Sequence, residues 1–89
     1  MEKNFYLMVN IQSLRADRTA IVGTINSTPS SQKELENIRD AMYPTILDLR
    51  YLVLMKPETS TEIWVPGSFI ENSIVSFQVV RSDTIHQKR

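Results

Sequence analysis

The sequence offers few residues that can transfer protons near neutral pH. Its only histidine, His86, lies in a polar stretch close to the last residue. An imidazole titrates nearest to neutrality of all side chains, but a catalytic group must be held in position by rigid packing. We therefore expect His86 to be a solvated residue and not a catalytic one. A Ser-His-Asp triad would need the same histidine, so we expect no triad.

Paired carboxylates are the remaining candidates for acid-base chemistry. The pairs are Glu34 with Glu36, Glu36 with Asp40, and Glu58 with Glu62. Glu36 and Asp40 lie one turn apart on a predicted helix, where Lys33 and Arg39 are close enough to neutralise their charges. We interpret them as solvated helix surface, the usual place for charged side chains. An enzyme with a carboxylate-based site remains a second alternative.

Cofactor and metal sites have little support. The sequence contains no cysteine, which excludes disulfides, thiolate zinc sites and iron–sulfur ligation. Its two glycines are isolated, whereas a phosphate cradle needs glycine where several backbone amides approach an anion. Gly23 lies in a predicted strand and indicates a bulge or close packing, and Pro66-Gly67 predicts a type II turn. We expect no cofactor and no metal.

Three aromatic residues on predicted strands, Tyr6, Tyr51 and Trp64, could stack on nucleic-acid bases. Lys and Arg number 10 and Asp and Glu number 10, and each half of the chain is balanced as well. This balance argues against nucleic acid and against an anionic membrane, because both attract basic surfaces. Arg15, Arg18, Arg50 and Arg81 could still gather on one side, so a single-stranded nucleic-acid binder is the alternative function.

Hydrophobic periodicity predicts one α+β domain over residues 1–81, followed by a flexible polar tail over 82–89. Strands are expected over residues 4–14, 19–26, 50–56, 61–65 and 73–81. A capping box at Ser31 and Glu34 predicts that a helix starts there, and Pro44 predicts that it ends near residues 41–43. The expected fold is a five-stranded, largely antiparallel sheet with one helix on one face, in the order ββαβββ.

One helix can cover one face of this sheet, yet the first strand is apolar on both. We assign Phe5, Leu7 and Val9 to the helix-covered core, which leaves a second face that needs another explanation. The segment 66–72 could fold beneath that face. Otherwise the second face is an exposed interaction surface. Its candidate residues are Tyr6, Met8, Leu52, Leu54 and Trp64.

These patterns favour a small non-enzymatic module for protein–protein interaction. We expect the partner to be a second copy of the chain, giving a homodimer through the apolar sheet face, or another protein. The longest apolar run, Leu52–Met55, is far shorter than the roughly 20 residues that span a membrane. The first residues lack the apolar block of a signal peptide. We therefore expect no membrane partner and a cytoplasmic location.

Overall fold

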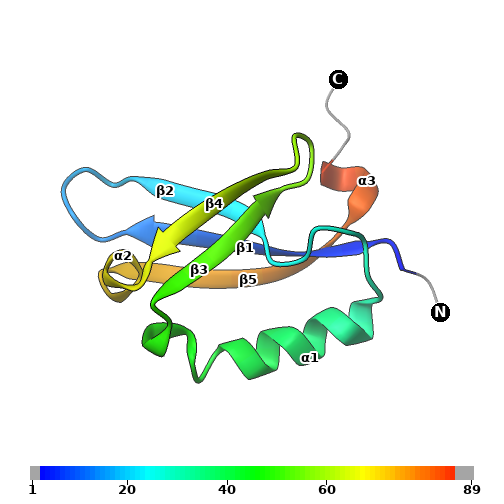
Figure 1. Ribbon diagram of the computed structural model, residues 1–89, viewed down its shortest axis with the longest axis horizontal. Helices are drawn as coiled ribbons and strands as arrows, with labels where there is room; N and C mark the ends of the chain where they lie inside the picture. The colour runs from blue at the N-terminus through cyan, green and yellow to red at the C-terminus, as the bar shows by residue number, and fades with distance from the viewer. Residues whose placement is uncertain (1–2, 86–89) are drawn as a thin grey trace.

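Five strands form one antiparallel sheet in the order β4-β3-β2-β1-β5 in the computed structural model, which describes residues 3–85 (Figure 1). The strands are β1 (Phe5–Ser13), β2 (Ala20–Thr24), β3 (Tyr51–Lys56), β4 (Thr61–Pro66) and β5 (Ser73–Arg81). The predicted strands are confirmed to within two residues at each end, and the predicted fold class is confirmed with them. Each strand coincides with a stretch of the sequence that contains β-branched or aromatic residues.

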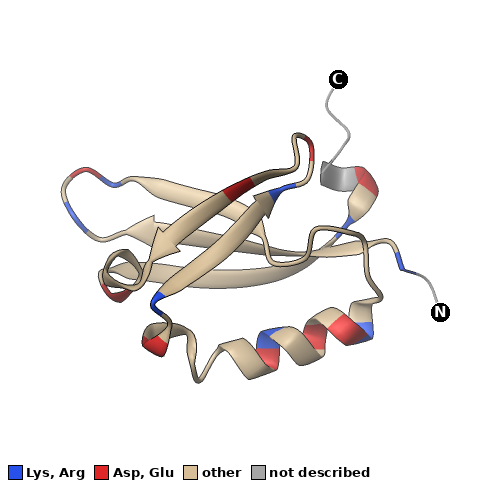
Figure 2. Ribbon diagram, in the orientation of Figure 1, with Lys and Arg blue, Asp and Glu red and all other residues tan. Residues whose placement is uncertain are grey.

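The main helix, α1, spans Gln32–Met42 and starts after the predicted capping box at Ser31. Three shorter helices are η1 (Ile46–Asp48), α2 (Gly67–Glu71) and α3 (Ser82–Ile85). Thus a short helix begins the segment that was expected to be a flexible tail. Charged residues concentrate on α1, on loops and at strand ends, and Glu62 alone lies inside a strand (Figure 2). Within the described chain no helix has the length and apolar character needed to cross a bilayer.

The sheet is strongly curled, because β2 and β3 pair at a single position, Thr24 with Met55. Beyond that point the β3–β4 hairpin crosses in front of β1 and β2 (Figure 1). Gly23 lies beside the crossing: a Cβ atom added there would be 2.7 Å from Leu54 Cβ. The prediction of close packing at this glycine is therefore confirmed.

The concave face of the sheet encloses the core. Its buried members are Val9, Ile11, Ile46, Leu52, Leu54, Val65 and Ile70. α1 packs against β1 and β5 on this face and contributes the buried side chain of Leu35. Leu7 and Val9 are fully buried, as expected for the helix-covered set. We call this side the covered face.

The segment 66–72 also lies on the covered face, which corrects one expectation. Ile70 of α2 is fully buried among core residues of β1, β3 and β4, so this segment does not cover the opposite face. The predicted type II turn at Pro66-Gly67 is wrong, since no glycine has a positive φ. Gly67 starts α2 instead, and a Cβ atom there would collide with the carbonyl oxygen of Leu49. The glycine is needed for close approach and not for an unusual backbone angle.

Candidate interaction surface

The opposite side of the sheet, here called the outer face, follows from the strand register. Antiparallel partners point to the same face, so the pairs Met8–Thr24, Thr24–Met55 and Met55–Glu62 form one row across the sheet. Val53 and Trp64 form the next row of the hairpin. We use the name hairpin face for the outer residues of β3 and β4, which are Tyr51, Val53, Met55, Glu62, Trp64 and Pro66.

Three of the five residues proposed for the second face lie on the outer face: Tyr6, Met8 and Trp64. Trp64 is 60% exposed and Met8 is partly buried. Tyr6 is only 4% exposed, so its ring is not available to a partner. It lies at the end of the outer face, paired with Val80 of β5.

Leu52 and Leu54 do not belong to the surface, which corrects the prediction. They pair with Val65 and Ile63, and they point into the core with exposures of 5% and 0%. The cause is the uniformly apolar sequence of β3. A strand without alternating polarity does not reveal which set of side chains faces the core.

Tyr51 and Val53 are the residues that take the place of these leucines on the outer face. The length of the hairpin loop could have identified Tyr51 and Val53 from the sequence. Four residues, 57–60, separate Lys56 from Thr61. A closed loop of that length pairs Lys56 with Thr61 and therefore Val53 with Trp64. Once Trp64 is assigned to the outer face, Val53 must share it.

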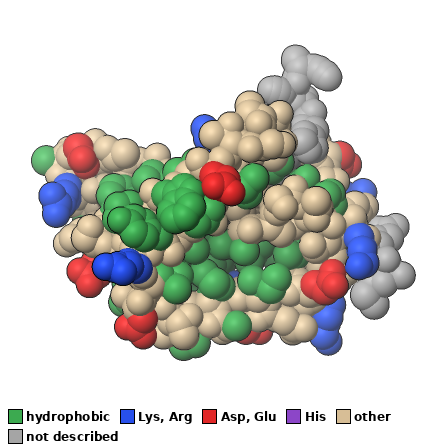
Figure 3. All heavy atoms as spheres, in the orientation of Figure 1, with side chains coloured by type: hydrophobic (Ala, Val, Ile, Leu, Met, Phe, Trp, Pro, Cys, Tyr) green, Lys and Arg blue, Asp and Glu red, His purple; other side chains and the backbone are tan. Residues whose placement is uncertain are grey.

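Tyr51 and Trp64 are the two aromatic residues of the hairpin face, Trp64 in its middle row and Tyr51 in an end row. Their ring centroids are 5.9 Å apart with an interplanar angle of 67°, an edge-to-face contact. The Trp64 Nε1–H group donates a hydrogen bond to Glu62 Oε1 at 3.1 Å. Although its ring contacts Trp64, Tyr51 remains 52% exposed. The space-filling view shows hydrophobic side chains gathered over β3 and β4, with an acidic group directly beside them (Figure 3).

A shallow pocket extends this surface toward β2. It has a volume of about 220 Å³ and begins at Met55. The other lining residues are Met8, Val22, Gly23, Thr24, Lys56, Pro57 and Glu58. Its floor is largely apolar, and Val22 is 42% exposed. The pocket therefore offers room for a small aliphatic group at the Met55 end of the hairpin face.

The carboxylates of the helix have local partners. Glu36 accepts a hydrogen bond from Gln32 Nε2 at 3.1 Å, and Asp40 pairs with Arg39 Nε at 3.2 Å. This is the solvated helix surface that the sequence predicted. Within residues 3–85 no three acidic or histidine side chains come together as a metal site would require. His86 lies outside the described residues.

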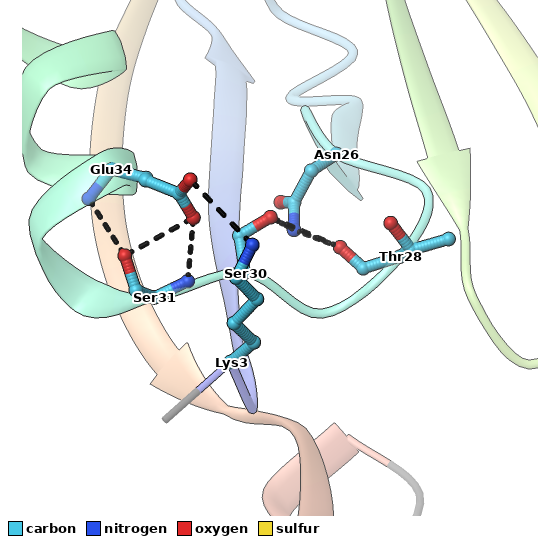
Figure 4. A network of polar contacts seen from close by, with 6 residues as sticks. All are labelled: Lys3, Asn26, Thr28, Ser30, Ser31 and Glu34. Carbon is cyan, nitrogen blue, oxygen red and sulfur yellow. Dashed lines mark hydrogen bonds and ion pairs between the residues drawn. The ribbon is translucent and has the colours of Figure 1, made fainter. Parts of the chain in front are cut away.

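Glu34 completes the capping box (Figure 4). Its Oε1 atom accepts from the backbone amide of Ser31 at 3.0 Å, while Ser31 Oγ accepts from the Glu34 amide at 3.2 Å. Hydrogen bonds from the amide and hydroxyl of Ser31, with a smaller contribution from Lys3, lower the pKa of Glu34. The pKa of Asp17 is also lowered, chiefly by the Thr19 amide. In both cases hydrogen bonds stabilise the charged form of a carboxylate that has a structural role.

Asn26 is the second polar element of this region (Figure 4). Its Oδ1 atom accepts from the Leu7 amide at 2.9 Å, and its Nδ2 group donates to the Thr28 carbonyl at 2.6 Å. The side chain thus continues the β1 ladder past the end of β2. It fixes the loop that leads into α1.

The arginines considered for nucleic-acid binding come from separated elements. Arg15 and Arg18 lie in the β1–β2 loop, Arg50 precedes β3, and Arg81 ends β5. Only Arg50 is adjacent in sequence to the hairpin face, where Glu62 adds a negative charge. The hairpin face therefore lacks the basic groove that usually accompanies stacking aromatics.

No protein-family model matches the sequence, and neither a curated protein nor a solved structure is significantly similar to it.

Proposed function

We propose that this protein is a non-enzymatic interaction module that binds another protein through its hairpin face. The observation that carries the proposal is the pair Tyr51 and Trp64, whose rings contact each other while each remains more than half exposed. Tyrosine and tryptophan are enriched at protein interfaces and among the residues that dominate binding energy. Their exposure side by side on the hairpin face fits that role.

The geometry also lowers the cost of binding. A side chain that is ordered before binding loses less conformational entropy when a partner arrives. The Trp64 ring is held by the Tyr51 edge contact and by the Glu62 hydrogen bond. Both rings also stand on paired strands and not on a loop. The hairpin face is therefore largely preorganised.

The pocket beside Met55 suggests the chemistry of the partner. Its largely apolar lining fits an aliphatic side chain, while Lys56 and Glu58 at its margin can pair with charges of either sign. We propose a partner segment in which an aliphatic residue enters the pocket and an apolar surface covers the two rings. Such an arrangement has a buried centre and a polar rim, as standard interfaces do.

The proposal is tested by capture of partners from the native cell, with the bound proteins identified by mass spectrometry. Trp64→Ala should lose the partners that the unchanged protein retains. Leu14→Ala is a matched control, because Leu14 is 65% exposed but lies in the β1–β2 loop. If Trp64→Ala and Leu14→Ala retain the same partners as the unchanged protein, the hairpin face is not the binding surface.

Single-stranded nucleic acid is the competing ligand, since the two exposed rings could stack on bases. The Glu62 carboxylate bonded to Trp64 argues against it, because a phosphate backbone would be repelled there. Trp64 is the only tryptophan and reports directly on this surface. We expect its fluorescence to stay unchanged on titration with oligonucleotides at low salt. Quenching that disappears at higher salt would favour the nucleic-acid function instead.

A further inference from the structure

β5 is a long edge strand with unusually little cover. None of its nine residues is buried, whereas its neighbour β1, of the same length, has buried side chains at five positions on the two faces. Those buried residues of β1 are Tyr6, Leu7, Val9, Ile11 and Ser13. On the outer face of β5, Ile74 is 60% exposed. Among the described residues, β5 pairs with β1 alone.

The backbone groups on the other edge of β5 can be assigned from its ladder with β1. The Ser82 amide donates to the Asn4 carbonyl at 2.8 Å, and the Leu14 amide donates to the Asn72 carbonyl at 2.9 Å. Bonded pairs alternate with non-bonded pairs in an antiparallel ladder, so the even-numbered residues of β5 bond to β1. The amides and carbonyls of the odd-numbered residues point away from β1. These residues are Ser73, Val75, Phe77, Val79 and Arg81.

The opposite edge of the sheet, β4, is protected against strand addition. The Gly67 amide donates to the Arg50 carbonyl at 2.9 Å. By the same alternation, the backbone groups of Glu62, Trp64 and Pro66 point away from β3, toward the free edge. Pro66 has no amide to donate, and Glu62 places a charge inside the strand. Proline and charge are common protections of edge strands. β5 has neither inside the strand, since its one charged residue is Arg81 at the end.

The sequence of β5 is also complementary to itself. Reversed about Phe77, it matches Ser76 with Gln78, Val75 with Val79, and Ile74 with Val80. Each match joins two residues of the same character, polar with polar and β-branched with β-branched. A two-fold axis at Phe77 would thus place residues of like character opposite one another along the strand, and each such contact would occur twice, once on either side of the axis.

We infer that a second copy of this chain pairs with β5, antiparallel and centred on Phe77, to form one continuous sheet across a homodimer. This inference does not depend on the proposed function, because β5 and the hairpin face lie at opposite edges of the sheet. It retains the homodimer expected from the sequence but moves the contact from the sheet face to a sheet edge. The backbone groups of Val75, Phe77 and Val79 supply the hydrogen bonds.

An aromatic side chain just after α1 adds to this contact. Tyr43, just after α1, touches Phe77 edge-on with ring centroids 4.8 Å apart, yet it is 53% exposed. Because Phe77 lies at the symmetry axis, the Tyr43 side chains of the two copies come close to each other across it.

Charge pairs across the axis test the register directly. In the dimer, position 76 of one copy faces position 78 of the other, and both side chains are exposed, so substitutions there spare the core. Ser76→Lys with Gln78→Lys places like charges opposite each other, whereas Ser76→Lys with Gln78→Glu places opposite charges there. By sedimentation equilibrium we expect a dimer for the unchanged protein, at least tenfold weaker dimerisation for the first variant, and retained or tighter dimerisation for the second.

A monomer at all concentrations for the unchanged protein would overturn the inference, and so would equal dimer affinities for the two double variants. Hydrogen exchange adds an independent measurement. The amides of Val75, Phe77 and Val79 should exchange slowly only at concentrations where the dimer forms, while the Gln78 amide, bonded to β1, stays protected throughout. Trp64→Ala should leave dimerisation unchanged. If this variant were monomeric, the contact would lie on the hairpin face, which would contradict the β5 interface.

Discussion

Leu7 and Met8 are neighbours in β1, yet their side chains meet different surroundings. Leu7 points to the covered face, where it is fully buried beneath the layer that contains α1. Met8 points to the outer face, where it lines a shallow pocket beside Val22 and Met55. Both side chains are apolar, but the covered face is closed by the chain itself and the outer face exposes aromatic rings. The comparison shows that apolar composition alone does not distinguish core from contact surface.

The largest effect is expected on the covered face. Leu7→Ala should lower the free energy of unfolding by roughly 2 to 5 kcal/mol, since it loses apolar burial and leaves a cavity among fully buried neighbours. Chemical denaturation measures the change. A loss below about 1 kcal/mol would mean that the covered face packs loosely and that the contrast between the two faces is weaker than described.

A smaller effect is expected at the helix start that leads into the covered face. Ser31→Ala should cost on the order of 1 kcal/mol, because the amide of Glu34 loses its acceptor. Thermal melting of the variant and the unchanged protein checks this value. An unchanged melting temperature would show that the capping box contributes nothing to folding.

The same variant should alter the response to acid. The folded-state pKa of Glu34 is lowered, so its contribution to stability is present above the unfolded-state pKa and is lost as the pH falls through the folded-state pKa. Ser31→Ala keeps the backbone amide that lowers this pKa most, but it removes the Ser31 hydroxyl, the second cause of the shift. Its stability should therefore fall less steeply than that of the unchanged protein as the solution is acidified. Parallel acid profiles for the two proteins would show that the Ser31 hydroxyl does not contribute to the lowered pKa of Glu34.

On the outer face the expected effect on stability is smaller still. Met8→Glu places a carboxylate on a partly exposed surface near Lys56, so we expect a loss of less than about 1 kcal/mol. Partner capture through the adjoining pocket should weaken, because the carboxylate must be desolvated in the contact. Denaturation and capture of the same preparation separate the two effects. Unfolding of this variant would show that the outer face is core.

The sequence predicted the strands, the main helix and the fold class because each of them depends on local signals. Alternation in residues 4–14 identified β1 and the face of the sheet on which Leu7 lies. The Ser31–Glu34 pattern located the start of α1. The sequence could not show which side chains of β3 face the core, since Tyr51–Met55 is apolar throughout. Burial of Leu52 and Leu54 depends on pairing with β4, which is a property of the folded sheet.

The remaining differences also involve distant contacts. α2 replaces the predicted turn because Gly67 packs against the carbonyl of Leu49, far from it in the sequence. Tyr6 alternates with the core residues, and its burial could not be expected from the pattern of β1 alone. The hairpin face was therefore only partly predictable: Trp64 was identified directly, while Tyr51 required the register of the hairpin.

Trp64→Ala gives the most direct test of the account, with the unfolding free energy and partner capture measured on one preparation. The side chain is 60% exposed, so its removal should lower the unfolding free energy by no more than about 1.5 kcal/mol, the upper range for a lost aromatic edge contact. Capture of partners from the native cell should nevertheless be lost, because the central ring of the hairpin face is gone. A variant that unfolds more easily but still retains its partners would contradict the account, since Trp64 would then serve the fold and not the contact.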